Sequence, residues 1–180
     1  MLGPPGAGKG TQASAIAEQF GVPAISTGEL FRAEAGRETP LGRRVAPLLN
    51  AGRLVPDDVA VEVVRERLAA PDAADGFVLD GFPRAVGQAE ALDDLLAVDG
   101  HALDTVIELV VGREELLRRL AGRGRPDDEP DSVVARLKDW ETENGPLVSY
   151  YRARGRLVEI DAGGPIATVT ARAVSVARRT

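Results

Sequence analysis

A glycine-rich segment near the beginning of the sequence carries residues that could hold phosphate groups. Residues 3–9 read Gly-Pro-Pro-Gly-Ala-Gly-Lys, a full match to the pattern G-x-x-x-x-G-K. Glycines let backbone N–H groups turn inward around phosphate oxygens, and a helix beginning near Gly8 would point its positive end at the same place. Lys9 would add a point charge for the β- and γ-phosphates. A glycine turn that only caps a helix is the alternative, but this lysine favours binding of a nucleoside triphosphate or another polyphosphate.

An acidic residue further along the chain could hold a metal ion that binds the same phosphates. The glycine pattern usually continues with Ser or Thr, which contributes to a magnesium shell. Here Gly10 occupies that place and Thr11 follows it. Asp80 ends the apolar run 77–80, which we interpret as a neighbouring strand, so its carboxylate could hold magnesium through water. The alternative is an ordinary acidic residue in a strand-end turn.

The segment 80–84, Asp-Gly-Phe-Pro-Arg, predicts a tight turn directly after that strand. Gly81 and Pro83 would place the turn at the carboxyl edge of a parallel sheet, where ligands bind, and would hold Arg84 over the phosphates. Four further arginines, each of which alone would usually be a solvated surface residue, stand in different sequence contexts: Arg32, Arg123, Arg125 and Arg136. If these arginines converge, they could stabilise a transferring phosphoryl group, a reaction that needs placed cations rather than a base.

The composition excludes several other kinds of chemistry. The chain has 180 residues, 44% of them hydrophobic and 28% charged, which is typical of a folded globular protein. The absence of cysteine and the single His101 exclude thiolate catalysis and disfavour a zinc site or a Ser-His-Asp triad. A net charge of −6 and 4% aromatic residues disfavour nucleic-acid binding. No apolar stretch is long enough to cross a membrane, and no secretory signal is evident, so we expect a cytoplasmic protein.

Hydrophobic periodicity and turn residues predict an alternation of helices and strands. This alternation indicates an α/β fold with a parallel sheet. We expect helices over 8–20, 28–35, 41–51, 56–70, 86–97, 113–122, 131–143, 146–153 and 165–178, and strands over 22–25, 77–80, 105–111 and 157–161.

The first strand is nearly absent from the sequence. A phosphate loop should follow a strand of about five or six residues, yet only Met1 and Leu2 precede Gly3. We therefore expect the natural protein to begin some four residues earlier with an apolar strand, and the first strand of this chain to be truncated.

In combination, motifs along nearly the whole chain resemble those of the adenylate kinases, in the bacterial form with a short lid. They read Gly-Pro-Pro-Gly-Ala-Gly-Lys-Gly-Thr-Gln (3–12), Ile-Ser-Thr-Gly-Glu-Leu-Phe-Arg (25–32), Gly-Arg-Leu-Val-Pro (52–56), Leu-Asp-Gly-Phe-Pro-Arg (79–84), Gly-Arg-Gly-Arg-Pro-Asp-Asp (122–128) and Pro-Leu-Val-Ser-Tyr-Tyr (146–151). The resemblance implies one P-loop kinase domain over residues 1–180, with an inserted helical flap that binds the nucleoside monophosphate (26–55) and a short lid (122–132). It also implies a magnesium-dependent monomer, without zinc, that converts ATP and AMP into two ADP.

The resemblance further implies roles for individual residues. The residues implied for ATP binding are Gly6, Ala7, Gly8, Lys9, Gly10, Thr11, Arg119, Arg123 and Gly164. The residues implied for AMP binding are Thr27, Arg32, Arg53, Leu54, Val55, Gly81, Phe82, Pro83, Arg84, Gln88, Arg125 and Arg136. The implied catalytic set is Lys9, Arg84, Arg123, Arg125 and Arg136, with Asp80 toward the metal.

Two other functions remain open from the sequence. A kinase of UMP and CMP would share the glycine loop and the Gly-Phe-Pro-Arg turn, but such relatives usually carry Ala and Asn in place of Thr27 and Gln88. The Gln88 amide can give and take hydrogen bonds with adenine, which favours AMP. The second alternative is a nucleotide-binding protein without catalysis, although all the expected arginines are present. Trp140 stands where the family more often has Tyr.

Overall fold

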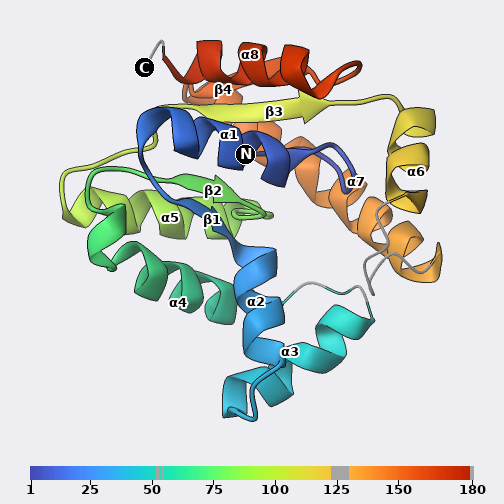
Figure 1. Cartoon of the computed structure of the whole chain (residues 1–180). Coiled ribbons are helices and arrows are strands. Elements are labelled where there is room, and N and C mark those ends of the chain that lie inside the picture. The colour runs from blue at the N-terminus through green and yellow to red at the C-terminus, as the bar shows by residue number, and fades with distance from the viewer. Residues whose placement is uncertain (52, 54, 123–129, 179–180) are drawn as a thin grey trace.

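The computed structural model describes residues 1–51, 53, 55–122 and 130–178 (Figure 1). Two pairs of parallel strands form its sheet: β1 (Ala24–Ser26) with β2 (Val78–Asp80), and β3 (Val106–Val110) with β4 (Leu157–Asp161). The helices are α1 (Lys9–Phe20), α2 (Thr27–Ala35), α3 (Pro40–Asn50), α4 (Asp57–Leu68), α5 (Val86–Val98), α6 (Arg113–Ala121), α7 (Pro130–Ala153) and α8 (Ile166–Ala177), with a 3₁₀ turn at Pro71–Ala73. The α/β class and the parallel strand pairing predicted from the sequence are confirmed.

The first two residues lie between the two strand pairs. The amino group of Met1 donates a hydrogen bond to the carbonyl oxygen of Leu79 in β2 (2.7 Å). On the other side, the N–H of Leu2 donates to Ile107 in β3 (2.8 Å), and the Leu2 carbonyl accepts from Leu109 (2.9 Å). Met1 and Leu2 therefore link β2 to β3 through hydrogen bonds. They form only an isolated β-bridge and not a regular strand. The longer first strand expected from the sequence stays a prediction.

The buried apolar side chains explain why these segments form these elements. β3 is buried on both faces, with Val106, Ile107 and Leu109 each at most 5% exposed, as expected of a strand inside a parallel sheet. Val106 packs in one cluster with Tyr151 of α7, and Ile107 and Leu109 pack in another with Ile16 of α1 and Val169 of α8. The sheet and its flanking helices therefore form the rigid frame from which the polar loops project.

Most predicted boundaries differ from the structure by one or two residues, and two of the differences have an identifiable cause. The strand predicted at 22–25 begins only after Pro23, which lacks an N–H for the ladder, and runs over Ala24–Ser26. The helices predicted at 131–143 and 146–153 form the single helix α7, which continues through Pro146. Proline inside a helix costs about 3 kcal/mol. Burial of Leu147, directly after the proline, and of Tyr151 further along is of comparable value, because fully burying one large apolar side chain is worth about 1.5–3 kcal/mol.

α2 and α3 form a helical pair at one end of the molecule, apart from the sheet (Figure 1). The Ser26 hydroxyl accepts from the N–H of Glu29 at the start of α2 (3.4 Å), and the Thr39 hydroxyl accepts from Gly42 at the start of α3 (2.9 Å). Such hydroxyl caps satisfy N–H groups that lack a partner within the helix. The sequence therefore marks both helix starts of the segment predicted to be the flap.

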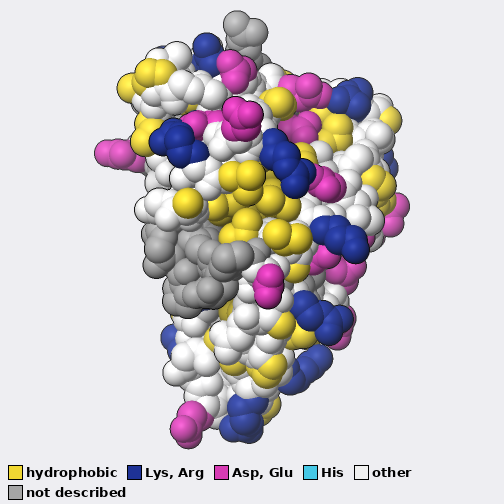
Figure 2. Space-filling view, turned by 90° about the vertical axis from the view of Figure 1, so that its right-hand side faces the viewer, with side chains coloured by type: hydrophobic (Ala, Val, Ile, Leu, Met, Phe, Trp, Pro, Cys, Tyr) yellow, Lys and Arg dark blue, Asp and Glu magenta, His cyan; other side chains and the backbone are white. Residues whose placement is uncertain are grey.

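The surface carries mixed charge. Figure 2 shows one face on which Lys and Arg side chains alternate with Asp and Glu around a group of hydrophobic side chains. Basic side chains thus form no continuous patch on this face, in keeping with the net charge of −6. Within the described ranges, none of the helices combines the length and apolar character needed to cross a membrane.

Candidate active site

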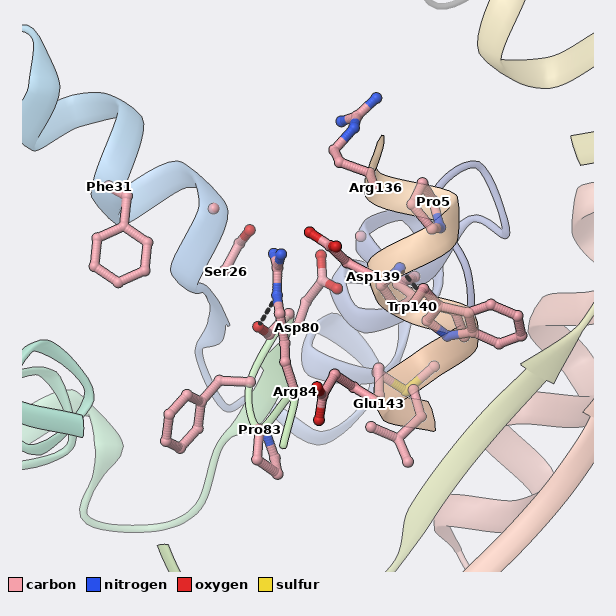
Figure 3. Close-up of a pocket in the computed structure, with 18 of the residues that line it drawn as sticks. Pro5, Ser26, Phe31, Asp80, Pro83, Arg84, Arg136, Asp139, Trp140 and Glu143 are labelled. Carbon is pink, nitrogen blue, oxygen red and sulfur yellow. Dashed lines mark hydrogen bonds between the residues drawn. The ribbon is translucent and has the colours of Figure 1, made fainter. Parts of the chain in front are cut away.

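A cavity of about 330 Å³ opens where the glycine loop, the end of β2, α2 and α7 meet (Figure 3). Phe31 faces it from α2, Asp80 and Arg84 rise from the strand end, and Arg136 and Glu143 come from α7. The size lies in the range of ligand sites, and the lining combines apolar walls with a few charged groups. The carboxyl end of β2 is thus the point on which the elements of the site converge.

The glycine loop presents its lysine at the start of α1. Lys9 is the first residue of this helix, so its ammonium group lies beside the helix's positive end. The Nζ atom donates to the carbonyl oxygens of Gly3 (2.8 Å) and Pro4 (3.0 Å) within the same loop. The ammonium group of Lys9 is therefore held against the backbone of the loop that the sequence predicts to bind phosphate.

Asp80 lies directly against the glycine loop. A Cβ atom built on Gly10 would stand 3.3 Å from the Oδ2 atom of Asp80, so a larger residue at position 10 would require this carboxylate to shift slightly. The Oδ1 atom of Asp80 is buried and has no hydrogen-bond partner among the residues that the structure describes. A buried oxygen of this kind fits a hydrated magnesium ion beside the phosphates. The described part of the chain contains no group of three or more His, Cys, Asp or Glu side chains arranged to hold a metal.

The turn after β2 is held by α2. Gly81 has φ +81°, and a Cβ there would lie 2.9 Å from the Thr27 hydroxyl, so both the conformation and the space require glycine. The Thr27 hydroxyl donates to the carbonyl oxygen of Asp80 (3.3 Å). The Arg84 Nε donates to the Gly81 carbonyl (2.8 Å), and a cis peptide bond joins Phe82 and Pro83. The turn therefore directs the Arg84 guanidinium into the cavity, as Figure 3 shows.

Gln88 lies on the first turns of α5 and is 3% exposed. Its Oε1 atom accepts from the backbone N–H of Arg84 (2.8 Å), and its Nε2 atom donates to Asp57 Oδ1 (2.6 Å). Sequence reasoning predicted Gln88 but missed Asp57, because nothing local marks an acid at the start of α4 as a partner of α5.

One face of α7 adds a polar wall that the sequence analysis also missed. Asp139, Trp140, Glu143 and Asn144 line the cavity beside Arg136. Asn144 Nδ2 donates to Oε1 of the buried Glu108 in β3 (2.9 Å). Their spacing from Arg136 follows the three- and four-residue repeat of one helix face, so this repeat could have identified them.

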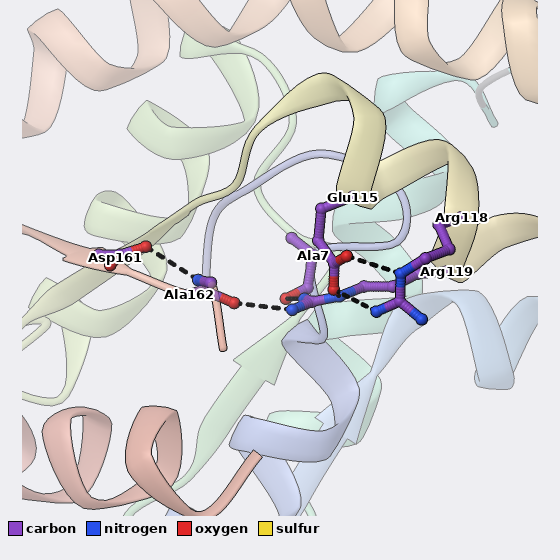
Figure 4. Close-up of polar contacts among 7 residues, drawn as sticks. Ala7, Glu115, Arg118, Arg119, Asp161 and Ala162 are labelled. Atoms are coloured by element: carbon purple, nitrogen blue, oxygen red, sulfur yellow. Dashed lines mark hydrogen bonds and ion pairs between the residues drawn. The ribbon is translucent and has the colours of Figure 1, made fainter. Parts of the chain in front are cut away.

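Arg119 connects α6 with the glycine loop and with the turn after β4 (Figure 4). Its guanidinium donates to the carbonyl oxygens of Ala7 (3.3 Å) and Ala162 (2.9 Å) and to Glu115 Oε1 (2.7 Å). Glu115 also accepts from Arg118 at 2.6 and 2.8 Å. Hydrogen bonds from Arg118 and then Arg119 lower the pKa of Glu115 from 4.5 to about 2. Arg119 is therefore held in place by three separate segments.

Most of the residues predicted for the site lie around the cavity. Those that line it are Gly6, Gly8, Lys9, Gly10, Thr11, Arg32, Arg53, Val55, Asp80, Gly81, Phe82, Pro83, Arg84, Gln88, Arg119 and Arg136. Ala7, Thr27 and Gly164 are not among the lining residues, although Ala7 and Thr27 bond directly to Arg119 and to Asp80, which line it. The predicted residues Leu54, Arg123 and Arg125 lie outside the described residues.

Taken together, the fold and the site define a class: a P-loop nucleotide kinase, in which a glycine loop and an acidic strand end face arginines across one cavity. A family model described as adenylate kinase matches residues 1–156. The chain is also similar to three curated adenylate kinases: from Mycobacterium tuberculosis (strain H37Ra), 51% identical over 97% of this chain and 95% of the relative; from Thermobifida fusca, 49% over 97% and 95%; and from Salinispora tropica, 44% over 99% and 96%. The chain belongs to the adenylate kinase family.

Proposed function

We propose that the two sides of the cavity bind the two substrates of one reaction, with ATP on the glycine-loop side and AMP on the α2 side. The reaction is the reversible transfer of a phosphoryl group from ATP to AMP, which gives two ADP and which membership of the family assigns to this chain. The alternative of a UMP/CMP kinase is not favoured, because the curated relatives are adenylate kinases at 40–51% identity.

On the ATP side, backbone N–H groups of the glycine loop and the positive end of α1 would hold the phosphates. Lys9 would bridge the β- and γ-phosphates as a point charge, and Arg119 would contact ATP from α6. Magnesium, when bound, supplies charge neutralisation between the β- and γ-phosphates, and Asp80 would hold it through water. This assignment is supported by the contact of Asp80 with Gly10 and by the buried, unpartnered Oδ1 atom among the described residues.

On the AMP side, the Gln88 amide would recognise adenine, and Arg84 would hold the monophosphate. Arg32 and Arg53 also line the cavity and would bind AMP from the flap 26–55, which carries α2 and α3. Backbone groups around Val55 and Gly81 would complete this side. The flap is proposed to move as a unit because its two helices pack mainly on each other, away from the sheet.

Catalysis would come from positively charged side chains placed around the transferring phosphoryl group. A transferring phosphoryl group spreads negative charge over its equatorial oxygens, and fixed positive groups that face it lower the barrier. Lys9, Arg84 and Arg136 line the cavity and would share this charge. Closure of a lid over the nucleotides, which is known behaviour of the family, excludes water that would otherwise accept the phosphoryl group. The roles of Arg123 and Arg125 in the lid 122–132 remain predictions.

The single observation that carries this proposal is the segment from Asp80 to Gln88. It places the Asp80 carboxylate against Gly10, then Arg84 and then the Gln88 amide, and all three side chains line one cavity. The test is an initial-rate assay with ATP as donor and AMP, UMP or CMP as acceptor. We expect AMP to be the preferred acceptor by a wide margin. Comparable rates with UMP or CMP would refute the assignment of AMP.

A further inference from the structure

The orientation of the Gln88 amide is fixed from two sides by groups of opposite character. Asp57 Oδ1 accepts from Nε2 (2.6 Å), and the backbone N–H of Arg84 donates to Oε1 (2.8 Å). A carboxylate only accepts hydrogen bonds, whereas a backbone N–H only donates them. Reversing the amide would set Oε1 against the Asp57 carboxylate and Nε2 against the Arg84 N–H. Because Gln88 is 3% exposed, water could not easily compensate for that mismatch.

These two contacts use only half of the hydrogen-bonding capacity of the amide. An amide has two acceptor positions on oxygen and two N–H donors, so one acceptor position and one donor remain. Gln88 lines the cavity, where the remaining pair would meet a purine base. Adenine offers a 6-amino donor beside the N1 acceptor. A 6-oxopurine offers the reverse, an acceptor at position 6 beside the N1–H donor, so an amide of fixed orientation can match only one of them in a given pose.

We propose that Asp57 is a specificity-determining positioning residue, which holds Gln88 in the orientation that accepts a 6-aminopurine monophosphate and rejects a 6-oxopurine monophosphate. Asp57 itself is not among the lining residues of the cavity, so it acts through Gln88. Its location on the first turn of α4 explains how: α4 packs against α5 and sets the carboxylate beside the amide. The inference rests on the proposed function, because it takes Gln88 to read the acceptor base.

The experiment compares AMP with inosine monophosphate as acceptors, since these differ only in the groups at position 6 and N1. The variants are Asp57→Ala, which removes the acceptor, and Asp57→Asn, which keeps the shape of the side chain but can present either N–H or oxygen. Asp58→Asn is the control, because Asp58 is the next acid on the same turn and is exposed like Asp57, whereas the side-chain hydrogen bond from Gln88 goes to Asp57.

We expect the ratio of kcat/KM for inosine monophosphate to that for AMP to rise about tenfold in Asp57→Ala, the size expected when one partly buried, charge-assisted hydrogen bond is lost. Asp57→Asn should show a smaller rise, because the Asn side-chain oxygen can still accept from Gln88 Nε2 in the native orientation. KM for ATP should not change in either variant, and Asp58→Asn should behave like the wild type. A merely structural role of Asp57 would lower thermal stability without moving the acceptor ratio.

An unchanged ratio in a folded Asp57→Asn or Asp57→Ala protein would overturn the inference. This outcome is distinct from failure of the proposed function, which would appear as a wild-type protein that does not phosphorylate AMP. If Asp57→Ala does not fold, the near-isosteric Asp57→Asn variant decides the question alone.

Discussion

The carboxylate of Asp80 lies so close to Gly10 that a Cβ atom at position 10 would stand 3.3 Å from its Oδ2 atom. The end of β2 and the start of α1 therefore meet without a side chain between them. The pattern of the glycine loop usually places Ser or Thr at this position, where the hydroxyl serves magnesium. In this chain the Asp80 carboxylate lies beside the space where that side chain would begin. The end of β2 therefore lies directly beside the predicted phosphate site.

This contact predicts the effect of a single methyl group. In Gly10→Ala the added carbon would push the Asp80 carboxylate by a few tenths of an ångström, and the magnesium concentration needed for half-maximal rate should rise about tenfold, the size expected when one charged contact is weakened. Gly87→Ala is the control, since a Cβ there meets nothing within 4 Å. Titration of the initial rate with magnesium measures the effect. Identical magnesium curves for the two variants would show that the contact is not functional.

Lys9 should contribute mainly to turnover. Its ammonium group donates to two carbonyl oxygens of its own loop, and Lys9→Ala should leave the fold intact. Loss of a charge that acts on the transferring phosphoryl group should lower kcat by roughly 10²–10³-fold. Lys138→Ala is a matched control, because Lys138 is the other lysine of the chain and is exposed on α7. A coupled assay of ADP formation gives the answer, and near-normal turnover of Lys9→Ala would remove this role.

Replacing Gln88 should change the KM of one substrate only. In Gln88→Leu the side chain keeps its approximate size but loses the amide that would bind adenine. KM for AMP should rise by roughly 10–100-fold, as expected for a lost pair of base-reading hydrogen bonds, while KM for ATP should change little. Initial rates measured while each substrate is varied in turn separate the two constants. An equal rise in both would place Gln88 outside the AMP side.

Glu115 is expected to position Arg119 toward ATP. In Glu115→Gln the guanidinium keeps its bonds to Ala7 and Ala162 but loses its ion pair, so KM for ATP should rise about three- to tenfold with KM for AMP unchanged. Glu114→Gln changes the neighbouring acid of α6 and serves as the control. If both variants shift the ATP constant equally, the general charge of α6 and not the Glu115–Arg119 pair is responsible.

The pH dependence of this pair has a definite sign. The pKa of Glu115 lies at about 2, below its ordinary value of 4.5, because Arg118 and Arg119 hydrogen-bond to the charged form. Any stabilisation from the pair is therefore fully present above the ordinary pKa and is lost as pH falls toward 2. The difference in ATP KM between the wild type and Glu115→Gln should thus stay constant from neutral pH down to about pH 5. A difference that changes over this range would contradict a permanently charged Glu115.

The parts of the site that follow from local chemistry could be predicted from the sequence. The glycine loop and the turn at 80–84 depend on glycine and proline at fixed offsets, and both were located together with Lys9, Asp80 and Arg84. The pairing of Asp57 with Gln88 could not be predicted, because it depends on how α4 packs against α5. The continuity of α7 through Pro146 has a similar cause: burial of the residues that follow, which no local rule reveals, outweighs the local cost of proline.

The central claim is that the chain transfers the γ-phosphoryl group of ATP to AMP. The most direct test incubates the protein with magnesium, AMP and ATP labelled in its γ-phosphate, and then locates the label. The account predicts that the label appears in ADP, in the phosphate newly attached to AMP, and that two ADP form for each ATP consumed. Label released as inorganic phosphate, with AMP left unchanged, would contradict it.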